Sequence, residues 1–400
     1  MKRFNYKAKE KETGKIVKGS IQAENEQTAG RLLIEQGYIP QTVTEEGNNI
    51  FGGKGHVTSK DRIMFTRQLA TLIGAGLPLA TSLRTVAEQT QAKAMKTIVE
   101  EILAKVEAGK TLYDSFAEYK DVFNGVYLAL IRAGETSGTL DLALKRLADQ
   151  EEKDAAMLSR IRGALVYPAI ILVVIIAVLA FMMIMVVPQV KGLYEDMGKE
   201  LPGLTKFLVG ISDFFAQFWW VVLIIVAAII AGLYYSVKKT SAGRKAADAF
   251  KINVPLFGAL FKKLYVSRFA RTTEMMLATG VPMLDSVKIA IESTNNVVVE
   301  EEYSKSLDII KGGKTLSEGL KERNYMLPLV PQMASIGEES GKIDEMLGKA
   351  ATVYENELDE QINAISTMIE PILMVIMAGL IGVVIGGTLL PIYSLVSSVA

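Results

Sequence analysis

The chain has 400 residues, of which half are apolar and 22% are charged, so it is neither an ordinary soluble domain nor a protein wholly embedded in lipid. Basic and acidic residues number 44 each, which argues against direct binding of nucleic acid. The absence of cysteine excludes disulfides, thiolate metal sites and cysteine nucleophiles. The single histidine, His56, excludes a His-rich metal site and a Ser–His–Asp set, and its Gly-rich surroundings are typical of a solvated linker.

Residues 1–46 predict a small α/β module. Two strands ("FNYKAKE" and "IVKGSIQA") flank a Gly turn, a helix follows and ends at Gly37, and "YIPQTV" forms a third strand. No apolar core follows the basic residues at the start, so this segment is not a signal peptide and we expect a cytoplasmic N-terminus. Residues 47–57, rich in Gly and polar side chains, predict a linker.

Three long uncharged runs predict transmembrane helices at residues 163–190, 214–237 and 371–396. Clustered Lys and Arg precede the first run and follow the second, which favours a cytoplasmic location for those ends. We therefore expect residues 58–162 and 238–370 inside, the loop 191–213 outside and an external C-terminus. Interface anchors for the second span are Trp219, Trp220, Tyr234 and Tyr235.

The chain contains an internal duplication, which decides its fold. "RQLATLIGAGLPLATSL" matches "RTTEMMLATGVPMLDSV", "GKTLYDSF" matches "GKTLSEGL", and "GETSGTLDLAL" matches "GEESGKIDEML", in the same order. Each unit has helical periodicity and ends in a span. The predicted fold is mainly α, with duplicated cytoplasmic helical bundles at 58–162 and 238–370, three transmembrane helices and the small N-terminal α/β module. Matched residues open and close two spans: Tyr167, Pro168 and Pro188 in the first unit, and Glu370, Pro371 and Pro391 in the second.

Neither copy of "GKT" (109–111 and 313–315) is a phosphate loop, because the required earlier glycine is replaced by Ala104 and Asp308. A helix-ending Gly followed by a helix-capping Thr explains both copies. No zinc signature occurs. We therefore expect no catalytic residues, no cofactor, no metal and no enzymatic activity.

The repeated "GETSG" and "GEESG" predict the start of a helix used twice. We assign the serine as the N-cap of the long helix that follows, the first glycine as the end of the preceding helix, and the glutamate as a surface residue that adds to the cap or meets a partner. Ser137→Ala should then cost about 1 kcal/mol of stability, and Glu135→Ala should cost little. The signature residues are Gly134, Glu135, Ser137, Gly138, Gly337, Glu338, Ser340 and Gly341.

Three features keep two interpretations each. The acidic runs at 149–154 and 355–361 are solvated faces, or surfaces for a basic partner or a divalent ion. The GxxxG pattern of Gly382 and Gly386 packs helices within the chain or between protomers. Glu370 reaches for the membrane interface or pairs with a partner.

The segment "RIRGALVYPAIILVVIIAVLAFMMIMVVP" resembles the signature of the type II secretion F family, as do the duplicated motifs and the N-terminal module. The second copy departs by placing Glu370 where the first has Tyr167. This resemblance implies an inner-membrane platform protein of a type IV pilus or type II secretion machine, acting as at least a dimer. It implies as partners a hexameric assembly ATPase, pilin or pseudopilin subunits, inner-membrane alignment proteins and the lipid bilayer; a retraction ATPase is a further partner that it allows.

The leading hypothesis is a type IV pilus platform that couples the ATPase to pilin insertion. A secretion pseudopilus or a DNA-uptake filament is the alternative within the family. A transporter is disfavoured because only three spans exist and none carries a mid-membrane charge. A membrane ATPase is disfavoured by the missing phosphate loop.

Overall fold

The computed structural model describes residues 2–10, 16–23, 26–35, 37–45, 56–198, 200–255 and 257–397. The expected Gly turn at 12–15 and most of the expected linker, residues 47–55, lie outside these residues. By contacts the chain separates into two compact units: residues 1–65 with 83–103, and residues 66–82 with 104–400.

The N-terminal module is a three-stranded antiparallel sheet with one helix, as the sequence predicts. Strand β1 (Lys2–Glu10) is central and pairs with β2 (Ile16–Ala23) and β3 (Tyr38–Glu45), in the order β2-β1-β3. The register with β3 shifts between Lys7 and Ala8. Helix α1 (Glu26–Glu35) precedes Gly37, whose φ of +83° fits a helix-ending glycine.

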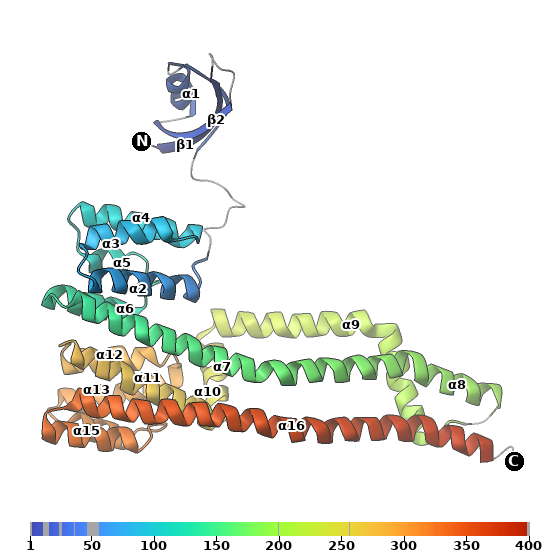
Figure 1. The fold of residues 1–400 in the computed structure, drawn as a ribbon. Coiled ribbons are helices and arrows are strands. Elements are labelled where there is room, and N and C mark those ends of the chain that lie inside the picture. Colours follow the sequence, from blue (N-terminus) through green and yellow to red (C-terminus); the bar gives the residue numbers. More distant parts are fainter. Residues whose placement is uncertain are drawn as a thin grey trace. The chain divides into compact units, whose positions relative to one another are not determined.

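The duplication predicted from the sequence is a repeat of six helices (Figure 1). Each of the first five is short and the sixth is much longer. The first copy is α2 (Ser59–Gly74), α3 (Leu79–Gln89), α4 (Lys93–Glu107), α5 (Leu112–Ala117), α6 (Gly125–Ser137) and α7 (Leu140–Phe181). The second copy is α11 (Gly258–Ala278), α12 (Met283–Ser293), α13 (Val297–Lys311), α14 (Leu316–Lys321), α15 (Leu329–Ser340) and α16 (Ile343–Ser397).

Aromatic side chains fill the core of both copies. In the first, the ring centroids of Phe116 and Phe123 lie 4.5 Å apart, and that of Tyr127 lies 4.7 Å from Phe123. In the second, Phe269 packs edge-on against Tyr303 at 5.3 Å within a cluster of buried aliphatic residues. Burial raises the pKa of the Tyr303 hydroxyl far above its usual range.

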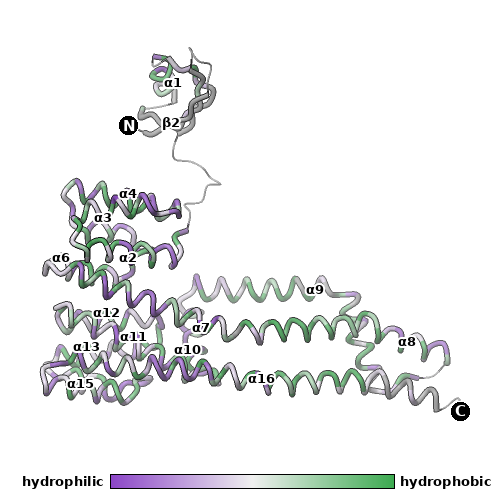
Figure 2. The backbone as a smooth tube through the Cα atoms, in the orientation of Figure 1, coloured by the Kyte–Doolittle hydropathy of each residue, from purple (hydrophilic) through white to green (hydrophobic). Residues whose placement is uncertain are grey.

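The sixth helix of each copy runs without interruption from the bundle into an apolar segment (Figure 2). Among the described residues, three helices are long and apolar enough to cross a membrane: Leu140–Asp196, Trp220–Lys239 and Ile343–Thr388. The first and third begin well before the expected spans, because the backbone is already helical in the bundle that precedes each apolar run. The second begins after the expected residue 214, and the third ends before the expected residue 396. A five-residue π-helix, η1 (Met182–Val186), joins α7 to α8 (Val187–Asp196). Helix α9 (Gly203–Lys239) begins within residues 191–213, which the sequence predicted to be an external loop.

The long helix α7 packs against apolar residues of α11 and α16 in the second bundle. Leu260, Leu264, Leu358 and Ile362 form a buried cluster, and Met157 of α7 packs against it. The α7 segment before the membrane is therefore part of the folded bundle rather than a free connector. Helix α10 (Ser241–Asn253) follows α9 and leads to α11.

Candidate functional site

The GETSG signature ends one helix, which corrects the expectation that its serine begins the next. Helix α6 continues to Ser137, and Gly138 is its C-cap in the left-handed conformation (φ +73°). The Ser137 hydroxyl donates back to the carbonyl of Ala133 at 2.7 Å. Thr139 takes the N-cap position of α7 without a capping hydrogen bond from its side chain.

The second copy repeats this geometry. Helix α15 ends at Ser340, whose hydroxyl donates to the carbonyl of Ile336 at 2.7 Å, and Gly341 has a φ of +70°. A Ser hydroxyl that bonds the carbonyl four residues earlier belongs to a helix interior or C-terminus rather than to an N-cap. The N-cap assignment of both serines is therefore wrong.

The first glycine of each signature lies inside a helix at a close approach of two backbones, and does not end the helix. A Cβ on Gly134 would lie 2.7 Å from the Ala143 Cβ, and one on Gly337 would lie 2.6 Å from the Ile343 Cα. Neither distance allows an ordinary side chain. These glycines let the fifth and sixth helices of each copy pack closely at the corner between them.

The glutamate of each signature caps a different helix, and it joins the two repeated motifs. The Glu135 carboxylate accepts the backbone N–H groups of Leu112 at 2.7 Å and Tyr113 at 3.0 Å. These are the first two residues of α5, which "GKT" precedes. Thr111 completes this start by accepting the N–H of Asp114 at 3.0 Å, which confirms the interpretation of "GKT" as a helix cap.

The same contact recurs in the second bundle. Glu338 accepts the N–H of Leu316 at 2.5 Å and the hydroxyl of Ser317 at 2.5 Å, and Thr315 accepts the N–H of Glu318 at 3.2 Å. A carboxylate at a helix N-terminus satisfies unpaired donors and is favoured by the helix dipole. Glu135 and Glu338 were expected to lie outside and to add to the cap of the following helix or meet a partner; they instead cap α5 and α14, so the small stability cost expected for Glu135→Ala is wrong.

A repeated arginine ties the first helix of each copy to the sixth. Arg67 of α2 donates to Glu152 at 2.6 Å and to Asp149 at 2.6 Å, and these hydrogen bonds raise the pKa of its guanidinium. Arg271 of α11 makes the matching bidentate contact with Glu355, with both bonds at 2.9 Å. The Arg67 side chain is 35% exposed and the Arg271 side chain only 13%.

In the described residues, two ion pairs join the two copies: Arg146 with Glu274, and Arg160 of α7 with Asp359 of α16. Arg146 of α7 lies 3.2 Å from Glu274 of α11, which is also 3.6 Å from Arg271. Burial raises the pKa of the Glu274 carboxyl, and the two arginines oppose that shift. The long helix of the first copy is thereby fixed to the second bundle by charge as well as by apolar packing.

The acidic runs at 149–154 and 355–361 supply the carboxylates for ion pairs with basic residues of α2 and α11. Asp149 and Glu152 bind Arg67, Glu355 binds Arg271, and Lys263 lies 2.7 Å from Glu357. Within the described residues, no group of three His, Cys, Asp or Glu side chains could hold a metal ion. The runs are therefore ion-paired faces of the long helices.

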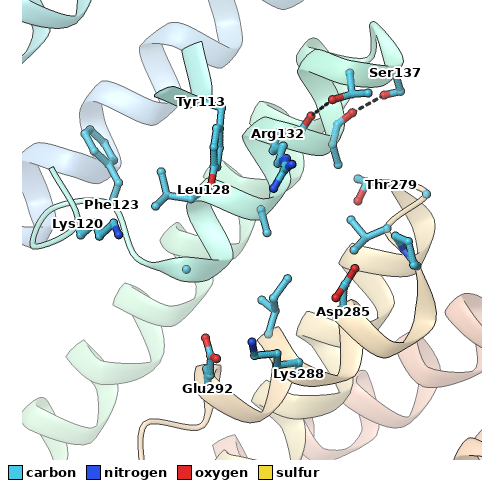
Figure 3. Close-up of a pocket in the computed structure, with 18 residues that line it drawn as sticks. Tyr113, Lys120, Phe123, Leu128, Arg132, Ser137, Thr279, Asp285, Lys288 and Glu292 are labelled. Carbon is cyan, nitrogen blue, oxygen red and sulfur yellow. Dashed lines mark hydrogen bonds between the residues drawn. The ribbon is translucent and has the colours of Figure 1, made fainter. Parts of the chain in front are cut away.

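A groove of about 860 Å³ separates α6 from α12 (Figure 3). Tyr113, Leu128 and Arg132 line it from the first copy, with Arg132 stacked 5.2 Å from the Tyr113 ring centroid. Asp285 and Lys288 face them from α12. The sequence patterns give no signal for this groove, because it forms only where the two copies meet.

The span residues expected as a signature lie within helices. Pro168 is inside α7 beside the half-exposed Tyr167, and Pro188 is in the first turn of α8. Glu370 and Pro371 are exposed within α16, which also contains Pro391, Gly382 and Gly386. One polar contact was not expected: the Ser212 hydroxyl of α9 donates to the Met183 carbonyl in η1 at 2.5 Å. It satisfies a carbonyl where the helical hydrogen-bond pattern changes.

These features define a class: a membrane protein whose described residues comprise three apolar helices and two helical bundles joined to them. Sequence comparison matches residues 65–188 and 269–391 to the family described as "Type II secretion system (T2SS), protein F". Residues 1–44 match "Type II secretion system protein F, N-terminal domain". The chain belongs to the type II secretion F family, and it is a non-enzymatic inner-membrane platform protein of type IV pilus or type II secretion machines.

Relatives from both kinds of machine are similar over nearly the full length. "Type IV pilus assembly protein PilC" of Thermus thermophilus is 34% identical, covering 99% of both chains. The protein of the same name from Myxococcus xanthus is 35% identical, covering 99% of this chain and 95% of its own. "Type II secretion system protein F" of Vibrio cholerae is 32% identical, covering 98% of both.

Proposed function

We propose that this chain is the platform of a type IV pilus machine, which couples a cytoplasmic assembly ATPase to the insertion of pilin subunits into the filament. The observation that carries this proposal is the continuity of α7 and α16. Helix α16 has 55 residues, or about 80 Å at 1.5 Å per residue. A force applied to the bundle at one end is transmitted along an uninterrupted helix to the membrane at the other.

The pilus branch is supported by the two PilC relatives at 34% and 35% identity. The second candidate is a platform that drives a secretion pseudopilus, which the Vibrio cholerae relative at 32% identity supports. Deletion of the gene separates them. The pilus proposal predicts loss of surface filaments with normal export of secreted enzymes, and the secretion candidate predicts the reverse.

We further propose that the bundles at 58–162 and 238–370 and the N-terminus lie in the cytoplasm, with the C-terminus outside. The basic ends of the first two spans support this orientation. We propose a homo-oligomer of at least two chains as the working form. A Cβ on Gly382 would meet nothing within 4 Å in the described chain, which supports packing of the GxxxG face between protomers.

A flexible insertion tests the coupling. A ten-residue Gly-Ser segment placed after Thr367, between the bundle and the span, should abolish filaments while the protein remains in the membrane at its normal level. The same segment placed within residues 47–57 is the control and should leave filaments unchanged. Normal piliation with the insertion after Thr367 would contradict coupling through α16.

A further inference from the structure

Helix α10 lies outside both copies of the repeat, directly after the second span. One extended residue, Thr240 (φ −116°, ψ 131°), separates it from α9, so the chain turns abruptly. A Cβ on Gly243 would lie 2.4 Å from the Ser236 carbonyl oxygen. Helix α10 is therefore held against the last turn of the membrane helix, where bundle and spans meet (Figure 1).

One face of α10 is bound to the second bundle. The buried Asp248 accepts the N–H of Val297 at 3.1 Å, and Ile252 lies in the core cluster with 2% exposure. The Lys245 ammonium donates to Glu301 at 2.6 Å. These contacts fix the rotation of α10 about its own axis, so the direction of its other face is also fixed.

The opposite face is apolar and uncovered. Phe250 is 71% exposed, and Ala242 and Ala246 precede it at four-residue spacing and are also exposed. A lone exposed apolar residue is ordinary on a protein surface. This one differs because its helix is fixed to the end of a membrane span.

Basic residues cluster where α9 meets α10. Lys238 and Lys239 end α9, while Arg244, Lys245 and Lys251 of α10 bind Asn295, Glu301 and Asp248. The Lys238 ammonium lies 4.7 Å from the ring centroid of Tyr234, which is itself 61% exposed. An aromatic ring and a basic cluster beside a span are the groups that anchor a helix at the headgroup level of an anionic membrane.

We propose that α10 is an interfacial helix that lies in the surface of the bilayer, with Phe250 among the upper acyl segments and Lys238 and Lys239 against the phosphate groups of anionic phospholipids. This contact fixes the height of the second bundle relative to the membrane. The assignment rests on the three spans and not on the choice between pilus and secretion machine. Within the described residues, no matching helix precedes α2 in the first copy.

The full chain tests this directly, because its lack of cysteine allows single-site labelling. Phe250→Cys in the full chain is spin-labelled and placed in nanodiscs of phosphatidylcholine with one third phosphatidylglycerol. The matched control is Ile336→Cys on α15. Ile336 is an apolar residue that is 47% exposed and lies far from the three spans in the sequence. Accessibility to oxygen and to a water-soluble nickel chelate reports lipid and water respectively.

The proposal predicts a label at 250 that collides with oxygen several-fold more than with the chelate, and the reverse at 336. A label at 250 as accessible to the chelate as that at 336 would overturn the proposal. So would a label at 250 shielded from both reagents, which would indicate that protein covers this face.

A second comparison tests the charges. Nanodiscs of phosphatidylcholine alone, or the substitutions Lys238→Gln and Lys239→Gln made together, should reduce the preference of the label for oxygen. An unchanged preference in both cases would contradict the role of anionic headgroups. Arg244, Lys245 and Lys251 are left in place because they bind Asn295, Glu301 and Asp248.

Discussion

The carboxylate of Glu135 accepts the backbone N–H of Leu112 at 2.7 Å, and this contact connects the two motifs that the chain repeats. Glu338 and Leu316 form the same contact in the second bundle. Both copies therefore contain the same contact, in which a glutamate near the C-terminal end of the fifth helix caps the N-terminus of the fourth helix. The repeated string is a structural joint of a platform rather than a catalytic site.

Glu338→Ala should destabilise the second bundle by about 1–3 kcal/mol, because it leaves backbone donors at the start of α14 without a partner. The adjacent Glu339→Ala is the matched control, since its side chain is exposed, and it should stay within about 0.5 kcal/mol. Thermal unfolding of the full chain in mild detergent measures both. Equal melting temperatures for the two variants would contradict the capping role.

Ser137→Ala should cost no more than about 0.5 kcal/mol, because the exposed hydroxyl bonds a carbonyl within its own helix and the exposed Thr139 hydroxyl, and caps no backbone N–H. Gly138→Ala should cost about 1 kcal/mol, since it forces a side chain into the left-handed conformation. The same melting experiment ranks them. A larger loss for Ser137→Ala would restore the serine as the N-cap of α7.

Gly134→Ala should destabilise the first bundle by about 1–3 kcal/mol through overpacking, because its Cβ would collide with Ala143 of α7. Gly163→Ala is the control, as a Cβ there meets nothing within 4 Å. It should be neutral or slightly stabilising, because Ala favours helix over Gly. A neutral Gly134→Ala would show that α6 and α7 are further apart than the structure places them.

Removal of Arg271 should cost about 3–5 kcal/mol, because Glu355 would be left partly buried without this partner and Glu274 would keep only Arg146. Removal of Arg67 should cost about 1 kcal/mol or less, because its ion pairs are exposed. Each arginine is replaced by Met, which retains an apolar side chain, and the loss of unfolding free energy is compared between the two variants. A loss of similar size at both positions would contradict the difference in burial.

The sequence was sufficient for the N-terminal module, the duplication and the three apolar helices, because each has a strong local pattern. Ser137 was assigned to the start of α7 although it ends α6. The two helices are so close in sequence that the residue pattern alone does not show to which of them the serine belongs. The role of Glu135 was missed because its partner, Leu112, contributes only a backbone N–H, which carries no signal in the sequence. The Arg146–Glu274 pair was missed because its two residues belong to different copies and the pairing is not repeated: Lys349 matches the charge of Arg146, but Ala70 stands where the second copy has Glu274.

The central claim is that the chain is a platform that acts on an ATPase and has no hydrolytic activity of its own. ATP turnover by the assembly ATPase from the same organism, measured with and without the full chain in nanodiscs, tests it most directly. The account predicts no hydrolysis by the chain alone and a faster turnover by the ATPase when the chain is present, unchanged by Lys110→Ala and Lys314→Ala. Hydrolysis by the chain alone, or an ATPase that is indifferent to its presence, would contradict the account.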